Sequence, residues 1–580
     1  MADVETPVLI VGAGPAGLTA ALALAKFGIE HVLVEKYPGT AHSPRAHIVN
    51  PRTVEIMRHL GIQDEIEAVS APHERLRHHV WYTTLNQPEI ARREAWGTSP
   101  HRKADYLTAS PCPSINCPQT RFEPVLVDAV RKAGSDVQFQ RELVSTKRDG
   151  DHWVSTIRNR EDESTYTIRS RYVIGADGAR TKMLGFAGLD IEGPSGLFHA
   201  ANIWFKADLS RYLAHRPGVL TWNMYPGPQP PLALGTFICM NPFDEFVLNR
   251  FYDPEVEDLS EMTEEQAIRH VERAVGEPVD DIEILGISGW KVNAQIAPEY
   301  ARDGVFCMGD AVHRHPPTNG LGLNMSVADA YNLAWKLALV LRGEAGPELL
   351  DTYNSERQPI GATGVDRAIR SLHQATAIQE AVGLHEGLSE EEGWQALASL
   401  KDPGPLGDER RAALRAALDK NENRFNALGL EVGYHYDTGA LVHDETPYPP
   451  FEGDPVLDFQ TTTRPGARVP HARLIRNGAQ ISTLDLIDGL EFALLVGLDA
   501  EHWFEAAEKA SVELGVKIVA HQIGGDDILD PYWEWIDARE VGHAGAVLVR
   551  PDRHIAWRSV DRPADATAEL TRVMKAVLSV

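Results

Sequence analysis

The stretch PVLIVGAGPAGLTAALALAKFG, residues 7–28, decides the fold. It opens with a short apolar run that suits a buried parallel strand. A glycine-rich turn follows, and then an apolar helical run that Gly28 can end. A second apolar run, HVLVE, ends in Glu35. The segment therefore predicts a strand, a tight turn, a helix and a second strand of an α/β fold.

The three glycines of this turn have the spacing that a bound dinucleotide requires. Gly12 permits the tight turn, Gly14 lets a pyrophosphate approach the backbone, and Gly17 lets helix and strand pack closely. The start of the helix adds free N–H groups and the positive end of the helix dipole. Glu35 lies where it can accept hydrogen bonds from a ribose. The predicted binding residues of this segment are Gly12, Gly14, Pro15, Ala16, Gly17, Glu35 and Lys36.

Two later apolar runs also end in a carboxylate next to a glycine. RYVIGADGAR, residues 171–180, contains Asp177, and GVFCMGDAVH, residues 304–313, contains Asp310. Ligands of open α/β sheets bind at the carboxyl ends of the strands, so Glu35, Asp177 and Asp310 can line one groove. A ligand with a ribose, a pyrophosphate and a polyol chain would use all three. This pattern favours FAD over NAD.

Longer segments carry a family resemblance that covers nearly the whole chain. PRAHIVNPRTVEIMRHLGI (residues 44–62), MGDAVHRHPPTNGLGLNMSVADAYNLAWKLALVL (308–341) and GAVLVRPD (545–552) resemble the class A FAD-dependent aromatic hydroxylases, in particular the phenol hydroxylase branch. The resemblance implies an α/β protein with a Rossmann-like FAD-binding domain of the p-hydroxybenzoate hydroxylase fold, an interleaved β-sheet substrate domain and a C-terminal thioredoxin-like domain. We place the FAD-binding domain in residues 1–85, 111–190 and 296–440, the substrate domain in 86–110 and 191–295, and the thioredoxin-like domain in 441–580.

The resemblance also implies a reaction. In this family NAD(P)H reduces FAD, oxygen forms a flavin C4a-hydroperoxide, and a phenolic substrate is hydroxylated, here ortho to its hydroxyl. The chain has no second GxGxxG, so NAD(P)H has no Rossmann domain of its own. This fits the family, in which the nicotinamide binds transiently, and the choice between NADPH and NADH stays open. Oxidative decarboxylation of a hydroxybenzoate and Baeyer–Villiger oxygenation of a polyketide remain alternatives on the same fold. A flavin dehydrogenase and a non-catalytic flavin redox sensor remain open as well.

Particular residues match positions that have roles in this family. Asp310 matches the aspartate that binds the ribityl chain of FAD. The following helix, which we expect to start near Asn324, points its N-terminus at the flavin pyrimidine. His47 matches the histidine that would deprotonate the phenol. The remaining FAD contacts implied are Arg45, Gln119, Asp177, Pro317, Gly320, Gly322, Leu323 and Asn324.

The expected substrate pocket departs from the pattern of the branch. Val219 stands where a member of the branch has a pocket aspartate, and Ile238 stands where it has an arginine, so substrate orientation should differ. A carboxylate substrate would want a cation, and the sequence places none firmly there. Aromatic residues in a strand-rich segment can equally be ordinary core. The candidate lining residues are Trp222, Asn223, Tyr225, Thr236, Ile238, Trp290 and Pro316.

Composition indicates which partners are unfavourable and which cellular compartment suits the chain. A net charge of −27 disfavours nucleic acid and anionic membranes. The first residues, MADVET, lack the basic start of a signal peptide. The four cysteines show no C-x-x-C spacing, which is typical of reduced thiols in a cytoplasmic protein. They are Cys112, Cys117, Cys239 and Cys307.

Two further expectations concern metals and assembly. His313 and His315 form an H-x-H pair without evident further ligands, so we expect loop hydrogen bonds rather than a metal site. The C-terminal domain has no cysteine and cannot carry out dithiol chemistry. We expect it to pack on the main body or to form the contact of a homodimer.

Overall fold

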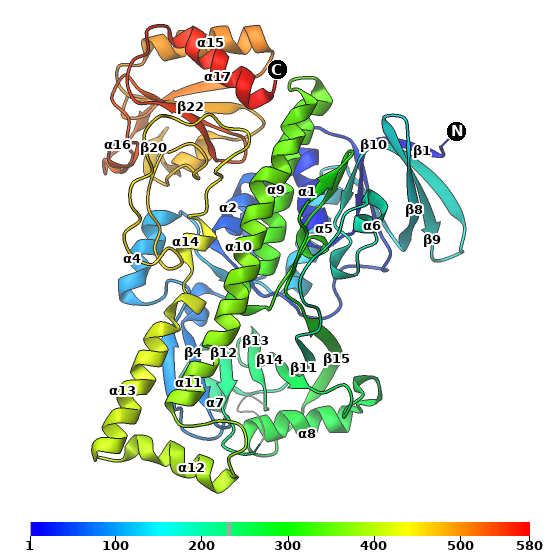
Figure 1. Ribbon diagram of the computed structural model, residues 1–580, viewed down its shortest axis with the longest axis vertical. Helices are drawn as coiled ribbons and strands as arrows, with labels where there is room; N and C mark the ends of the chain where they lie inside the picture. The colour runs from blue at the N-terminus through cyan, green and yellow to red at the C-terminus, as the bar shows by residue number, and fades with distance from the viewer. Residues whose placement is uncertain (1, 229–233) are drawn as a thin grey trace.

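A mostly parallel sheet forms the centre of the first domain in the computed structural model, which describes residues 2–228 and 234–580 (Figure 1). Val11 lies opposite both Val34 and Gly175, and Gly175 lies opposite Cys307, so these parallel strands end at one edge. The order of the main path is β17 (Ala301–Arg302), β18 (Val305–Cys307), β10 (Thr165–Gly175), β1 (Val4–Val11), β2 (His31–Glu35) and β7 (Asp136–Phe139). The hairpin of β8 (Arg141–Asp149) and β9 (His152–Asn159) extends β10.

Buried helices pack against this sheet. Helix α1 (Pro15–Lys26) contacts both α5 (Gln119–Lys132) and α9 (Leu321–Arg342), and α10 (Thr352–Gln374) runs beside α9 (Figure 1). Helix α9 is buried on nearly all sides, because other elements enclose it. None of the helices in the described ranges combines the length and apolar character that a bilayer crossing needs.

A second sheet forms the other half of the main body. One face packs on α8 (Glu264–Val275), and the other meets an apolar cluster that includes Ile48 and Val219. Strand β4 (His78–Tyr82) already belongs to this sheet, although it precedes the insertion predicted at 86–110. The order is β15 (Glu283–Val292), β11 (Phe198–Lys206), β14 (Glu245–Tyr252), β13 (Thr236–Asn241), β12 (Gly218–Asn223), β4 (His78–Tyr82) and β5 (Ala91–Glu94).

The C-terminal region has a sheet of its own, seen at the top of Figure 1. Strands β22 (Phe492–Val496) and β23 (Ile518–Gln522) are parallel, whereas β25 (Ala546–Val549) pairs antiparallel with both β22 and β26 (Ile555–Ser559). Helices α15 (Glu501–Leu514) and α17 (Ala566–Leu578) pack on one face. The description thioredoxin-like stays a prediction. The order is β23 (Ile518–Gln522), β22 (Phe492–Val496), β25 (Ala546–Val549) and β26 (Ile555–Ser559).

Buried ion pairs join this C-terminal domain to α9 and α10. Arg550 donates to Glu356 at 2.7 Å and to Asp552 at 2.5 Å, and Lys336 of α9 donates to Glu356 at 2.8 Å. These side chains have almost no exposed surface. Removal of one partner would leave an uncompensated buried charge, so the network strongly favours this one docking position.

Candidate active site

The predicted strand, turn and helix around the glycines are confirmed, and the turn has the crowding that glycine relieves. Gly12 has a φ of +110°, and an added Cβ would overlap the carbonyl oxygen of Ala176. An added Cβ on Gly17 would overlap the carbonyl oxygen of Gly12. Gly14 caps α1 and has open space at its Cβ position, while Pro15 is the first residue of the helix. The open space at Gly14 is where a phosphate can approach the free N–H groups.

The three carboxylates lie at neighbouring strand ends. Glu35 accepts hydrogen bonds from the backbone of Ala13 at 2.8 Å and of Tyr37 at 3.0 Å. Asp177 accepts from the backbone of Lys182 at 2.7 Å, and its Oδ1 is buried without a partner among the described residues. Asp310 is exposed just after β18. The neighbouring Lys36 is half-buried, with its ammonium group 5.2 Å from the centre of the Tyr37 ring.

This edge fits FAD. The open space at Gly14 suits a pyrophosphate, the unpartnered oxygen of Asp177 needs a donor, and exposed Asp310 can accept from a polyol chain. All three positions follow parallel strands that end at the same edge of the sheet.

The glycine-broken loop leads into α9 earlier than predicted. The helix begins at Leu321, three residues before Asn324, because Gly320 adopts a left-handed conformation (φ +65°) and caps it. Gly320 also lies close to the loop of His47, since an added Cβ would sit 3.2 Å from Cβ of Ile48. The free N–H groups therefore belong to the turn that contains Gly322 and Leu323. The helix ends at Arg342, and Gly343 caps it in a left-handed conformation (φ +73°).

Side chains in this loop differ in exposure. Pro316 and Leu323 are buried, and Pro317 is exposed. His315 Nδ1 lies 2.8 Å from the carbonyl oxygen of Pro316, in line with the predicted loop hydrogen bond.

His313 belongs to a buried network that extends beyond the loop. Its Nε2 lies 2.8 Å from Asp329, which also accepts from Arg357 at 2.8 Å and from the backbone of Gly309 at 3.1 Å. Burial alone would raise the pKa of Asp329, but the charges of Arg357 and His313 outweigh it and lower the pKa. The Asp329 carboxylate therefore holds the turn that precedes Asp310. No group of three or more potential metal ligands occurs in residues 2–228 and 234–580.

His47 is half-buried and oriented by an amide. Its Nδ1 lies 3.0 Å from Oδ1 of Asn116, whose Nδ2 donates to the carbonyl of Cys239 at 3.0 Å. Because that donation fixes the amide, Oδ1 accepts from Nδ1–H, and the lone pair of His47 is on Nε2. Burial lowers the pKa of His47 to about 4, against the opposing effect of Asn116, so the imidazole is neutral near pH 7.

The other two predicted FAD contacts flank His47. Arg45 is exposed in the same loop. The backbone of Gln119 donates to the carbonyl of Ala46 at 2.8 Å, and its side chain donates to Glu123 at 2.6 Å. The start of α5 therefore supports the loop through this backbone hydrogen bond. The side-chain amide of Gln119 already has a hydrogen-bond partner within the protein.

The second sheet separates the predicted lining residues into two faces. Residues that lie directly opposite in a ladder share a face, and successive residues alternate. Trp222 lies opposite Thr236, and Ile238 lies opposite Leu220, on the face that packs toward Ile48. Trp290 lies on this face too, and its indole N–H donates to Asn202 at 3.3 Å. The two departures are apolar side chains: Val219 is buried in the cluster that includes Ile48, and Ile238 is half-buried.

Asn223 and Tyr225 do not belong to this lining face. Asn223 follows Trp222 on the strand, points to the opposite side, and donates to the carbonyl of Ala274 in α8 at 2.8 Å. Tyr225 packs on the same opposite cluster, with the guanidinium of Arg273 5.7 Å from its ring centre. The prediction of Asn223 as a pocket residue is corrected because the strand period turns its side chain toward α8. That of Tyr225, which lies beyond the end of β12, is corrected because its side chain packs on the same opposite cluster.

Several residues near Trp222 carried no signal in the sequence. His79 accepts a hydrogen bond from the indole N–H of Trp222 at 3.2 Å. Its ring centre lies 3.6 Å from that of Phe425 and 4.7 Å from that of Trp96. Arg424 lies beside Phe425 and is buried. No motif marks these positions, because strands and loops that are far apart in the chain bring them together.

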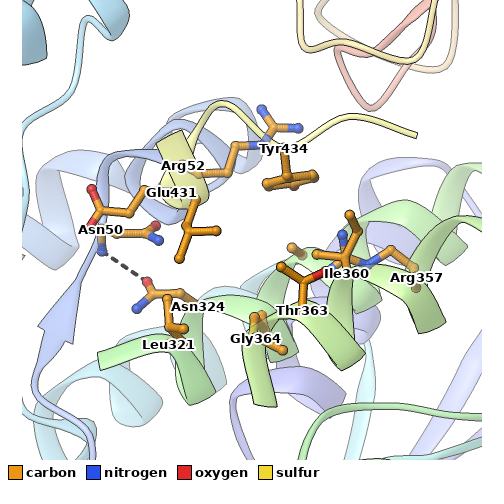
Figure 2. A pocket seen from close by; sticks show the side chains of 13 residues that line it. Asn50, Arg52, Leu321, Asn324, Arg357, Ile360, Thr363, Gly364, Glu431 and Tyr434 are labelled. Atoms are coloured by element: carbon orange, nitrogen blue, oxygen red, sulfur yellow. Dashed lines mark hydrogen bonds between the residues drawn. The ribbon is translucent and has the colours of Figure 1, made fainter. Parts of the chain in front are cut away.

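A small cavity of about 50 Å³ lies behind the first turn of α9 (Figure 2). Asn50, Arg52 and Glu431, from α14 (Leu428–Glu431), line it together with Asn324 of α9. The volume has room for a few water molecules. Burial raises the pKa of Glu431 to about 7, so this carboxyl is partly protonated near neutral pH.

Comparisons with known proteins agree with this arrangement. Residues 5–368 match the family model described as FAD binding domain, and residues 462–579 match the one described as aromatic-ring hydroxylase, C-terminal. The chain belongs to the class A FAD-dependent aromatic hydroxylases, and FAD is its cofactor.

The similarity to individual relatives extends over nearly the whole chain. It is 41% identical to 2,4-dichlorophenol 6-monooxygenase of Delftia acidovorans over 100% of this chain and 99% of the relative. It is 40% identical to phenol 2-monooxygenase of Pseudomonas sp. (strain EST1001), over 98% and 92%. Among solved structures, the flavin-dependent monooxygenase PieE in complex with FAD and substrate superimposes with a TM-score of 0.96 at 46% identity, covering 100% of both chains.

Proposed function

We propose that this enzyme hydroxylates a phenolic aromatic substrate ortho to its hydroxyl, using NAD(P)H and molecular oxygen. The two relatives at about 40% identity carry names that place the new oxygen next to a phenol hydroxyl, at position 6 or position 2. Bound FAD would supply the redox chemistry that activates oxygen. The protein's own residues must bind the cofactor, orient the phenol and manage its proton.

The proposed FAD site follows the edge of the first sheet. Its glycine turn and the start of α1 would hold the pyrophosphate, Glu35 would accept from a ribose, and Asp177 and Asp310 would accept from the rest of the chain. The first turn of α9 would stabilise negative charge on the flavin pyrimidine. The proposed binding residues are Gly12, Gly14, Pro15, Ala16, Gly17, Glu35, Lys36, Arg45, Gln119, Asp177, Asp310, Pro317, Gly320, Gly322, Leu323 and Asn324.

The observation that carries the proposal is the orientation of His47. Its Nδ1–H is held by Asn116, so the lone pair of Nε2 is available to a phenol O–H. The apolar face of Trp222, Thr236, Ile238 and Trp290 would receive the aromatic ring, with Pro316 nearby in the loop.

His47 alone is too weak a base for an ordinary phenol. A free phenol has a pKa near 10. Burial lowers the pKa of His47 to about 4, so proton transfer from an ordinary phenol to this imidazole is strongly unfavourable. The anion must therefore be stabilised by another group, or His47 must act mainly as a hydrogen-bond acceptor. A cation near the pocket would meet this requirement.

We also propose a cytoplasmic homodimer. The four cysteines are free and buried, which suits a reducing compartment. The C-terminal domain exposes large apolar side chains, among them Phe504, Val512, Tyr532 and Trp533, which a second subunit could cover. Sedimentation of the FAD-loaded protein tests the dimer, and a monomer at working concentrations would contradict it.

The proposed function is tested by oxidation of NADPH and of NADH by the FAD-loaded enzyme, with and without a panel of substituted phenols. We expect at least one phenol to accelerate oxidation and to gain one oxygen by mass spectrometry. Acceleration without oxygen gain, or no response to any phenol, would contradict hydroxylation of a phenol.

A further inference from the structure

Arg424 is a buried cation without a matching anion. It ends the short helix η8 (Glu422–Arg424) and is 5% exposed. Its Nη1 donates to Asn421 at 3.0 Å, whereas its Nε has no partner and no carboxylate pairs with it in the described part of the chain. Burial and the charge of Arg367 lower the pKa of Arg424 to about 9, so it is still positive near pH 7. By contrast, the buried Arg357 and Arg550 both have carboxylate partners.

His79, close to Arg424, provides a second hydrogen-bond donor that has no acceptor. Its Nδ1 accepts from Trp222, so the neutral ring carries its hydrogen on Nε2. This Nε2 is buried and has no partner among the described residues. Burial lowers the pKa of His79 well below its usual value, and the charge of Arg424 lowers it further. His79 is therefore a neutral N–H donor that lacks an acceptor.

Arg424 and His79 lie among the same aromatic side chains. The Arg424 guanidinium lies 5.0 Å from the ring centre of Phe425 and 5.4 Å from that of Trp222. The ring of His79 packs on Phe425 and on Trp96. Aromatic walls of this kind suit a planar ring ligand.

These aromatic side chains lie next to the proposed flavin site. Trp96, Trp222 and Phe425 belong to the same apolar cluster as Ile48, which directly follows His47. The carbonyl oxygen of Asn423, next to Arg424, accepts from the side chain of Asn319 in the loop before α9 at 2.8 Å. Arg424 and His79 therefore lie beside the place where the substrate ring is expected.

We propose that Arg424 and His79 form a receptor for an anionic oxygen on the aromatic substrate. The oxygen is either the ionised phenol itself or a carboxylate on the same ring, and both accept charge-assisted hydrogen bonds from a guanidinium. The inference rests on the proposed function and deepens it, because it defines the substrate as one that binds as an anion. It also supplies the cation that the sequence did not place.

The first experiment measures ligand binding to the FAD-loaded enzyme through changes in flavin absorbance, without turnover. One arm compares the three hydroxybenzoates with the matching hydroxybenzamides. A carboxylate receptor should bind an acid at least about 10-fold more tightly than its amide. The other arm adds 4-nitrophenol below its solution pKa, where a phenolate receptor should bind it as the yellow anion. If neither arm shows tighter binding of the anion, the proposal is overturned.

The second experiment uses variants. Arg424→Gln should raise the Kd of the preferred anion about 10- to 100-fold and that of its neutral analogue less than about 3-fold. Arg424→Lys should restore part of the preference, and Arg415→Gln, an exposed change on the preceding helix, is the matched control. Equal weakening of anion and neutral analogue would mean that Arg424 only supports the aromatic wall, and would overturn the proposal.

These readouts stand apart from the proposed reaction. If no phenol gains oxygen but anions bind preferentially, the proposed function fails and the receptor stands. If Arg424→Gln does not fold, the preferences of the unmodified enzyme and of Arg424→Lys still decide the matter.

Discussion

The side chain of Asn324 accepts a hydrogen bond from the backbone N–H of Asn50 at 2.9 Å, although the two residues are 274 positions apart. The same amide donates to the carbonyls of Ile48 at 3.0 Å and Gly320 at 2.7 Å. One side chain thus ties the loop of His47 to the first turn of α9. The proposed base and the proposed flavin-facing helix end are held in one fixed relationship.

Replacement of Asn324 by Ala should loosen this connection. The buried N–H of Asn50 and carbonyl of Ile48 would lose their partner, which should destabilise the fold by about 1–3 kcal/mol. Phenol-stimulated NAD(P)H oxidation should fall more than the melting temperature alone explains. Urea unfolding and steady-state kinetics measure the two effects. Asn324→Asp keeps the acceptor for Asn50, so retention of full activity by Asn324→Ala but not by Asn324→Asp would contradict this role.

His47→Ala should lower kcat/KM for an ordinary phenol by about 100-fold or more, the usual contribution of a positioned base. Phenols that are more acidic should suffer less, because they need less help to ionise. Since the pKa of His47 is about 4, its protonation should cause no inflection near pH 6.5 in kcat/KM. FAD content, measured by absorbance, should stay the same. An equal loss for all phenols regardless of acidity would argue against a proton-accepting role.

The two glycines of the turn should respond differently to Ala. Gly14→Ala places a methyl group in open space, so the apoprotein should fold with nearly unchanged stability while FAD affinity falls at least about 10-fold. Gly17→Ala forces a clash with the Gly12 carbonyl and should destabilise the protein by about 3 kcal/mol or more. Thermal melting and FAD titration separate the cases. Equal FAD affinity in Gly14→Ala and the unmodified protein would place the pyrophosphate elsewhere.

Glu431 should make the protein less stable at high pH. Its pKa is raised to about 7 in the fold, against 4.5 as the ordinary value, so the folded state favours the protonated form. The resulting cost is absent below about pH 4.5 and complete above about pH 7, where it approaches about 3 kcal/mol. Glu431→Gln should therefore raise the melting temperature at pH 8 and change it little at pH 5. Glu409→Gln, an exposed change on the surface of α13 (Pro405–Lys420), is the control, and equal effects at both pH values would refute the assignment.

The sequence alone predicted the parts of the site that depend on neighbouring residues. The turn from Gly12 to Gly17 follows from local backbone geometry, which a short segment specifies. Asp177 and Asp310 were also predictable, because parallel strands bring their carboxyl ends to one edge. The start of α9 was placed three residues late, since the left-handed cap at Gly320 has no unique sequence signal.

Tertiary structure decided everything that depends on which face or which distant segment meets another. Trp222 and Asn223 are adjacent in sequence, yet the strand period sends one toward the proposed substrate and the other toward α8. Asn116, which orients His47, lies 69 positions from it. Arg424 meets Trp222 only because η8 folds back over the second sheet. A sequence pattern records local geometry, whereas these contacts arise from long-range packing that no short pattern encodes.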